Sequence, residues 1–408
     1  MRLRETAEWN IIARDEPSHP SEPAMKQIDA VSLTQSLVRI DTVNPPGNED
    51  ACIQQLESLL SAAGFACSRS EFAARRTSLL ARIGAGAGEH AALCFTGHVD
   101  VVPLGSAQWK HDPFGGEIVD GQLFGRGSSD MKSGVAAFVA AAVSLAPMLR
   151  ESRGLSMVLT AGEETGCEGA FHLVADPAMR GRLGSAEALL VGEPTGNRPL
   201  IGHKGAFWLS ASATGKTAHG SMPQSGDNAI YKIARAALAL EHLDFGVPAH
   251  PLMGAPTMNV GTVHGGLNIN SVPDSAQLAI DIRTIAGQDH EQVMRCVCQA
   301  LGPQIGLKKL LDVASVYTQP DDPWVAHVYE LCQRHTGETA APATVSYFSD
   351  AAALRDPLGG PPTIILGPGE AAMAHQTDEY CRVDRILQAQ AIYADIIRER
   401  CLVPARLA

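Results

Sequence analysis

The sequence lacks the cysteine spacings that mark a disulfide framework or a zinc ribbon. Its nine cysteines are scattered over 408 residues without a C-x-x-C pair. The closest two, Cys296 and Cys298, fall on a predicted helix, where side chains two residues apart diverge. Because scattered free thiols are typical of reducing compartments, we expect a cytoplasmic protein.

Positive charge and long apolar runs are also scarce. The chain has 32 Lys and Arg against 44 Asp and Glu, a net charge of −12, so its composition does not favour nucleic-acid binding. The longest apolar run, 134–149, is too short to span a bilayer and contains Pro147. The first residues lead into no apolar segment of the signal-peptide kind. We therefore expect no nucleic-acid partner, no membrane span and no leader.

What is present is the composition of a globular protein. Apolar residues make up 45% and charged residues 19% of the chain, which indicates a sizeable core. The length predicts two to three domains. Residues 1–24 are polar, contain three prolines and show no helical periodicity, so we predict a flexible N-terminal arm there.

Alternating strand and helix patterns begin after this arm. Short apolar runs at 78–83, 91–96, 155–161 and 188–191 predict strands, and helical patterns lie between or beside them. Polar residues follow the later strands directly. This order predicts an α/β sheet with a site at one rim.

The pattern changes after residue 204 and resumes at 318. Between these points we predict the order β-α-β-β-α-β, with helices at 228–243 and 290–301 and a last strand at 314–317. That order is typical of a ferredoxin-like domain.

The predicted fold is therefore a mixed-sheet α/β/α catalytic domain, residues 25–204 and 318–408. An inserted ferredoxin-like α+β domain, residues 205–317, interrupts it.

Two glycine-containing stretches do not fit nucleotide-binding loops. Residues 84–88 lead into a strand, whereas a dinucleotide-binding turn must open a helix. The stretch 210–217 has Ser210 where a phosphate-binding loop needs glycine, and no helix is predicted to start there. A nucleotide-dependent enzyme is therefore excluded.

Histidine and acidic residues gather at the predicted strand ends. They are His98, Asp100, Asp130, Glu163, Glu164, Glu193 and His375. Two histidines and several carboxylates without cysteine suit a hydrolytic zinc, cobalt or manganese centre rather than a structural zinc site. Repulsion among converging carboxylates raises their pKa values unless cations neutralise them. The pattern thus predicts a metal centre at the rim of the sheet.

Six ordered motifs carry a resemblance to a known family. They are T-G-H-V-D-V-V-P, G-R-G-S-S-D-M-K-S-G, A-G-E-E-T-G, G-E-P-T, G-K-T-A-H-G-S-M-P and A-H-Q-T-D-E-Y. From about residue 33 to 397, the chain resembles the co-catalytic zinc family of acetylornithine deacetylase, succinyl-diaminopimelate desuccinylase, aminoacylase and carboxypeptidase G.

The resemblance implies two divalent metal ions, zinc in the first place, with cobalt or manganese as alternatives. It implies that Asp130 bridges the two ions. His98 and Glu193 then complete one site, and Glu164 and His375 complete the other. Such a pair of ions activates a shared water and polarises the scissile carbonyl.

The same resemblance implies roles for two neighbouring carboxylates. Asp100 orients His98. Glu163 is the general base, which takes a proton from the water and hands it to the leaving amine. The peptide bond between Asp130 and Met131 is expected to be cis.

The inserted domain is expected to act as a lid and as a dimerisation domain. By resemblance, His219 reaches an active site, often that of the partner subunit in a homodimer, and hydrogen-bonds the oxyanion. Asn270 and Arg283 match positions that hold a substrate carboxylate, for which an Arg fork is suited. Gly367 is expected to line the pocket.

We therefore predict a hydrolase that cleaves the amide bond of an N-acyl amino acid. A dipeptidase or carboxypeptidase of the same family, and a metal-binding homologue without catalysis, are the alternatives; the presence of Glu163 argues for an active enzyme. At 347–352 the chain has Y-F-S-D-A-A. At this position the acetylornithine enzymes usually have a stretch similar to G-T-E-A-G. Ser349 and Asp350 partly match the T-S-D of succinyl-diaminopimelate enzymes, so the acyl group and the amino acid stay open.

Overall fold

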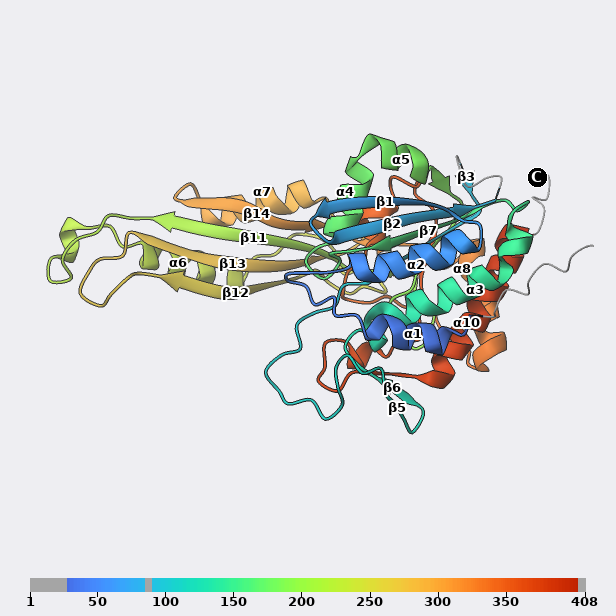
Figure 1. The fold of residues 1–408 in the computed structure, drawn as a ribbon. Helices are drawn as coiled ribbons and strands as arrows, with labels where there is room; N and C mark the ends of the chain where they lie inside the picture. The colour runs from blue at the N-terminus through green and yellow to red at the C-terminus, as the bar shows by residue number, and fades with distance from the viewer. Residues whose placement is uncertain (1–27, 85–89, 403–408) are drawn as a thin grey trace, which may run out of the picture.

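The computed structural model describes residues 28–84 and 90–402. Figure 1 shows a layered α/β body from which a second, narrower sheet extends. The flexible arm predicted for residues 1–24 lies outside the described residues. All nine cysteines are free thiols, as their spacing predicts.

The main sheet has six strands in the order β1-β2-β7-β4-β9-β16. In that order they are β1 (Ala66–Ala73), β2 (Arg76–Ile83), β7 (Leu155–Thr160), β4 (Leu93–His98), β9 (Leu189–Val191) and β16 (Thr363–Ile365). Strand β2 is antiparallel to both β1 and β7, whereas β7, β4, β9 and β16 run parallel. The predicted mixed sheet is therefore confirmed.

Helices cover both faces of the main sheet (Figure 1). One face packs against α1 (Ala30–Val38), α2 (Asp50–Ala62), α3 (Ser133–Leu149), α8 (Pro323–Thr336) and α10 (Val383–Ile397). The other packs against α4 (Glu168–Ala175), α5 (Pro177–Leu183) and α9 (Ala351–Leu354). Because successive strand residues point to opposite faces, Phe95 enters the first core and Cys94 the second.

Helix α3 lies in the centre of the first core and is apolar nearly all round. Together with the preceding turn η1 (Ser128–Lys132) it forms a stretch, Ser128–Leu149, long and apolar enough to cross a bilayer by length and composition. The regular helix begins only at Ser133, because Asp130 and Met131 have non-helical backbone angles, so the expectation that the run 134–149 is too short to span a bilayer is not contradicted. Moreover, 83% of the most apolar window of this stretch is buried inside the protein. Its burial identifies it as a core helix.

Residues 205–313, called here the inserted domain, form a separate antiparallel sheet in the order β12-β13-β11-β14. Its elements are β11 (Gly205–Thr214), α6 (Ala229–Glu241), β12 (Thr257–Gly265), β13 (Ser275–Thr284), α7 (His290–Leu301) and β14 (Ile305–Val313). Asn228 and Asp289 cap the two helices through their side-chain oxygens. This is the predicted β-α-β-β-α-β order; a role as lid or dimerisation domain stays a prediction.

The last strand of the inserted domain was predicted in the wrong place. The structure has β14 where the sequence shows no clean alternation, because Leu310 forms a bulge: Leu209 pairs with Lys309, and Trp208 pairs with Leu311. One extra residue shifts the side chains to opposite faces and hides the strand in the sequence. The residues predicted as that strand instead form β15 (Val316–Tyr317), which pairs with β10 (Gly202–His203).

Short strands and turns complete the described chain. They are β3 (His90–Ala91), β5 (Ile118–Val119), β6 (Gln122–Phe124), β8 (Ser185–Ala186), β17 (Tyr380–Arg382), η2 (Pro223–Ser225), η3 (Ala371–Met373) and η4 (Arg398–Leu402). Close packing brings α3 against the end of β9, since a Cβ on Gly134 would lie 2.1 Å from the Gly192 carbonyl oxygen. The start of α3 and the carboxyl ends of β4, β7 and β9 therefore meet at one rim.

Candidate metal centre

The predicted metal-ligating side chains converge on this rim. His98 is the last residue of β4, Glu163 and Glu164 follow β7, and Glu193 follows β9. Asp130 lies in η1, just before α3, and His375 lies on the loop after η3. The Asp130–Met131 peptide bond is cis, as the resemblance implies. Parallel strands bring their carboxyl ends to the same edge, so these residues meet although they are far apart in sequence.

Asp130 stands between the two histidines. Its Oδ1 lies 3.3 Å from His98 Nε2, and its Oδ2 lies 3.5 Å from His375 Nε2. Glu193 Oε1 lies 3.7 Å from His98 Nε2, and Glu164 Oε2 lies 3.2 Å from His375 Nε2. Asp130 therefore lies between His98 with Glu193 and His375 with Glu164. Ligand atoms that lie within 4.8 Å of one another also form the groups His98–Asp130–Glu164 and His98–Glu163–Glu193, and the pairing that the resemblance implies stays a prediction.

The chemistry of these groups fits divalent cations. Asp130 Oδ1 and Glu164 Oε1 are buried oxygens without a hydrogen-bond donor, although buried acceptors are normally paired. Within residues 28–84 and 90–402, no Lys or Arg forms an ion pair with the acids of the cluster, which are Asp130, Glu163, Glu164 and Glu193. Imidazole and carboxylate are ligands of hydrolytic zinc, cobalt and manganese sites. The residues would therefore hold two cations that neutralise the cluster.

The pKa values record the same shortage of positive charge. Burial, the charge of Asp130 and the charges of neighbouring acids raise the pKa of Glu193 well above its usual value. Contacts with Asp130 and Glu164 raise the pKa of His375 to about 10. Burial alone lowers the pKa of His98, but the contact with Asp130 and the charges of Glu193 and Glu163 raise it well above its usual value. The acids thus attract protons that bound cations would replace.

Glu163 differs from Asp130, which faces two histidines. Its Oε2 lies 4.0 Å from His98 Nε2, the longest of the ion-pair distances around that ring. The side chain is 7% exposed and lines the cavity beside the cluster. Burial raises its pKa well above the usual value, and Glu193 and Asp350 raise it further. A high-pKa carboxyl at the edge of such a cluster is suited to holding and moving a proton.

Asp100 contacts His98 in a way that the sequence did not predict. His98 Nδ1 lies 3.0 Å from the main-chain carbonyl oxygen of Asp100, whereas its distance to the carboxylate Oδ1 is longer, at 3.6 Å. The carboxylate instead accepts hydrogen bonds from the backbone N–H groups of Glu163 and Glu164 and from Asn44 Nδ2. Asp100 therefore orients the imidazole through its backbone and holds the Glu163 loop through its side chain.

Sequence reasoning missed a buried ion pair that joins the two metal-binding loops. Glu379 accepts hydrogen bonds from the backbone N–H groups of Gly127, Ser129 and Asp130. Arg126 Nη1 donates to Glu379 Oε2 at 2.6 Å, and Arg126 Nη2 lies 3.4 Å from the carbonyl oxygen of His375. Both residues belong to the quoted motifs G-R-G and D-E-Y, which were the available signal.

We expect Glu379→Gln to weaken metal binding by about 10–100-fold, as changes behind metal ligands commonly do. The substitution leaves Arg126 buried without its counter-charge and loosens the backbone of Asp130. Competition with a chelator measures the zinc affinity, with Glu399→Gln, whose partner Arg334 is on the surface, as the control. Unchanged affinity in the Glu379 variant would show that the pair has no role at the site.

The predicted substrate residues separate into two places. Arg283 lines a cavity of about 370 Å³ together with Asp130, Glu163, Glu164, Glu193 and His375. It also pairs with Asp281, Nε to Oδ1 at 2.9 Å. Gly367 does not line that cavity; a Cβ there would lie 2.3 Å from the Gly192 carbonyl oxygen, so glycine permits close backbone packing.

His219 and Asn270 lie at the opposite end of the inserted domain. Strands β11 and β13 pair along their whole length, from Gly205 with Thr284 to Thr214 with Ser275. At about 3.3 Å per residue, this pairing spans roughly 30 Å. His219 forms a β-bridge with Ser271, beyond the far end, and its side chain is exposed. Neither residue therefore lines the cavity of its own chain.

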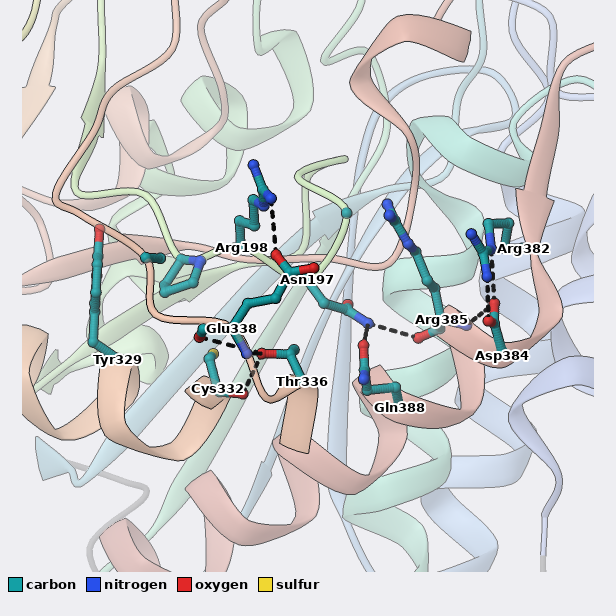
Figure 2. A pocket seen from close by; sticks show the side chains of 13 residues that line it. Asn197, Arg198, Tyr329, Cys332, Thr336, Glu338, Arg382, Asp384, Arg385 and Gln388 are labelled. Atoms are coloured by element: carbon teal, nitrogen blue, oxygen red, sulfur yellow. Dashed lines mark hydrogen bonds and ion pairs between the residues drawn. The ribbon is translucent and has the colours of Figure 1, made fainter. Parts of the chain in front are cut away.

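A second cavity, of about 240 Å³, lies between the loop after Glu193 and helices α8 and α10 (Figure 2). Its arginines are paired with acids, in the pairs Arg198–Glu338, Arg382–Asp384 and Arg385–Glu370. Asn197 Nδ2 donates to the Arg385 carbonyl oxygen and to Gln388 Oε1, each at 2.9 Å. This cavity is charge-balanced, and its hydrogen bonds tie the Glu193 loop to α10.

A site of this kind, with buried histidines and carboxylates gathered at one cavity, fits a metal-dependent hydrolase. The chain belongs to the peptidase family M20/M25/M40, whose family model matches residues 94–399. It is therefore a metal-dependent amidohydrolase of a metallopeptidase family.

Individual relatives agree with this assignment. An acetylornithine deacetylase from Vibrio cholerae serotype O1 is 29% identical over 401 residues, which cover 94% of this chain and 100% of the relative. A succinyl-diaminopimelate desuccinylase from Cereibacter sphaeroides is 34% identical over 390 residues, covering 91% and 99%.

Solved structures share the fold. A metallo-carboxypeptidase of the M20 family from Sulfolobus solfataricus has a TM-score of 0.73 at 17% identity, covering 91% of this chain and 98% of the other. A dinuclear metal-binding peptidase of the same family from Bacillus subtilis has a TM-score of 0.64 at 15% identity, covering 91% and 98%.

Proposed function

We propose that this protein hydrolyses the amide bond of N-acyl amino acids, with Glu163 as the general base. The observation that carries the proposal is the position of Asp130. Its two oxygens face His98 and His375 separately, while Glu163 borders the same cavity. This arrangement leaves one carboxyl free for proton transfer.

The two groups of ligands would each hold one divalent cation. When bound, a pair of such ions lowers the pKa of a water molecule and polarises a carbonyl group. Zinc is the first candidate, and the donor set also suits cobalt or manganese.

The chain's own residues would then do the following. Glu163 accepts the proton of the attacking water at its carboxylate and donates it to the leaving amine. Asp100 holds the backbone of this loop in place, because its carboxylate accepts hydrogen bonds from the backbone N–H groups of Glu163 and Glu164. Arg283 presents a guanidinium at the wall of the cavity, where it can bind the substrate carboxylate.

A panel of substrates tests this function against its alternatives. We expect the zinc-loaded or cobalt-loaded protein to release free amino acids from N-acetyl, N-succinyl or N-aroyl amino acids. Faster cleavage of dipeptides would favour the dipeptidase or carboxypeptidase alternative. No turnover of any member of the panel would mean that the chain is a silent homologue.

We also expect about two divalent ions per chain in protein purified without chelator. A histidine must lose its proton to bind a metal, and the pKa of His375, raised to about 10 by Asp130 and Glu164, means that it carries one near pH 7 without a metal. Metal binding should therefore release protons, and the apparent affinity should fall as pH falls. Elemental analysis measures the stoichiometry, and calorimetry in buffers of different ionisation enthalpy measures the protons. One ion per chain that zinc, cobalt and manganese cannot supplement would contradict the two-metal site.

A further inference from the structure

Three aromatic side chains form one wall of the cavity that holds the metal-ligating residues. Trp208 comes from β11 of the inserted domain, and Tyr347 and Phe348 come from the loop before α9. Pro194 and Ala374 add further apolar surface. The cavity is therefore lined by both acidic and aromatic side chains.

The aromatic wall is held in position by specific contacts. Trp208 Nε1 donates to Asp281 Oδ1 at 2.9 Å, and the Tyr347 hydroxyl donates to the Pro194 carbonyl oxygen at 3.0 Å. The Trp208 and Phe348 rings meet edge to face, with centroids 6.5 Å apart and planes at 73°. Rings that are already fixed lose little freedom when a ligand packs on them.

A guanidinium, paired with one carboxylate, lies beside this wall. Asp281, which fixes Trp208, also pairs with Arg283, so the ring and the guanidinium are set side by side by one carboxylate. Trp208 and Asp281 are direct partners across the two strands, and Arg283 follows two residues later on the same face. Burial and the nearby charge of Arg283 lower the pKa of Lys204 on the adjoining loop. A substrate carboxylate is therefore favoured at this corner.

A second amino group on the substrate would find no partner. Among residues 28–84 and 90–402, the only acids that line the cavity are Asp130, Glu164 and Glu193, the candidate metal ligands, and Glu163, the proposed general base. An ammonium group buried without a counter-charge is strongly disfavoured. Basic amino acids therefore fit this cavity poorly.

We propose that the preferred substrates are N-acyl amino acids with an aromatic or branched apolar group, which packs on Trp208 and Phe348, and one free carboxylate at Arg283. The proposal rests on the amide-hydrolase function proposed above and defines its substrate class. It separates this chain from the basic substrates that the names of its deacetylase relatives indicate.

The test compares matched substrates and matched variants. We expect kcat/KM for N-acetylphenylalanine and N-acetylleucine to exceed that for N-acetylornithine by about 10²-fold, as an apolar pocket with an unmatched charge implies. Phe348→Ala should raise KM for N-acetylphenylalanine by about 10-fold more than it raises KM for N-acetylglycine. Phe171→Ala, on the exposed face of α4, is the control and should change neither. Trp208→Phe should retain more of the preference than Trp208→Ala.

Binding provides a readout that does not depend on turnover. Calorimetry with metal-loaded Glu163→Gln protein should show tighter binding of N-acetylphenylalanine than of N-acetylornithine, and Phe348→Ala in that background should remove the difference. If amides are hydrolysed but N-acetylornithine is the equal or better substrate, the aromatic-wall proposal is wrong while the hydrolase function stands. If nothing is hydrolysed, the function fails, and equal binding of the two compounds would overturn the wall proposal as well.

Discussion

Replacing Glu163 with glutamine is expected to lower kcat by about 10²–10⁴-fold while the metal content stays the same. Glutamine has nearly the same size and can keep the contacts of the buried side chain, but its amide cannot accept and return a proton. The high pKa that burial and neighbouring acids give Glu163 is the property that the substitution removes. Steady-state kinetics on the best substrate of the panel and elemental analysis of the same preparation measure both quantities.

Two further variants make this result specific. Asp130→Ala removes the carboxylate that faces both histidines, so metal content and activity should fall together. Glu168, at the start of α4, the helix that follows this loop, is about half exposed, at 47%, and Glu168→Gln should behave as the unchanged protein. Full activity in the Glu163 variant would show that another group is the base.

Replacing His219 with alanine is expected to lower kcat by about 10²–10³-fold with both metals retained, the effect of removing one oxyanion donor. This expectation rests on the proposal that the inserted domain presents His219 over a metal centre. His219 is exposed and lies roughly 30 Å of strand away from the cavity of its own chain. For this proposal to hold, His219 must act either after a large movement of the inserted domain or on the site of a second copy. His242→Ala, an 85% exposed histidine of the same domain, is the control.

Mixed dimers separate these two possibilities. If His219 acts in trans, His219→Ala protein mixed with Glu163→Gln protein forms hybrids with one complete site. Random mixing makes half of the dimers hybrid, so on the order of one quarter of the wild-type activity should return. Mass spectrometry of differently labelled subunits measures the exchange. Confirmed exchange without recovered activity would mean that His219 acts within its own chain or has no catalytic role.

Much of the candidate metal centre could be predicted from the sequence because its histidine and acidic residues lie at the ends of strands. His98, Glu164 and Glu193 each stand at or just beyond an apolar run, and parallel strands must bring such positions together. The inserted ferredoxin-like order was predictable because α6 and α7 carry clear caps and helical periodicity. The bulged strand β14 was not, because Leu310 interrupts the alternation on which strand prediction depends.

The sequence by itself determined which side chains are candidate metal ligands, since those residues recur at fixed places relative to local strand patterns. Only the tertiary structure decided what surrounds them. Trp208 and Phe348 meet because β11 of the inserted domain packs against the loop before α9 of the main body. No local sequence pattern predicts that contact. The same holds for His219 and Arg283: both lie in the inserted domain, but the direction of a ten-residue strand pair places one at the cavity and the other at the far end.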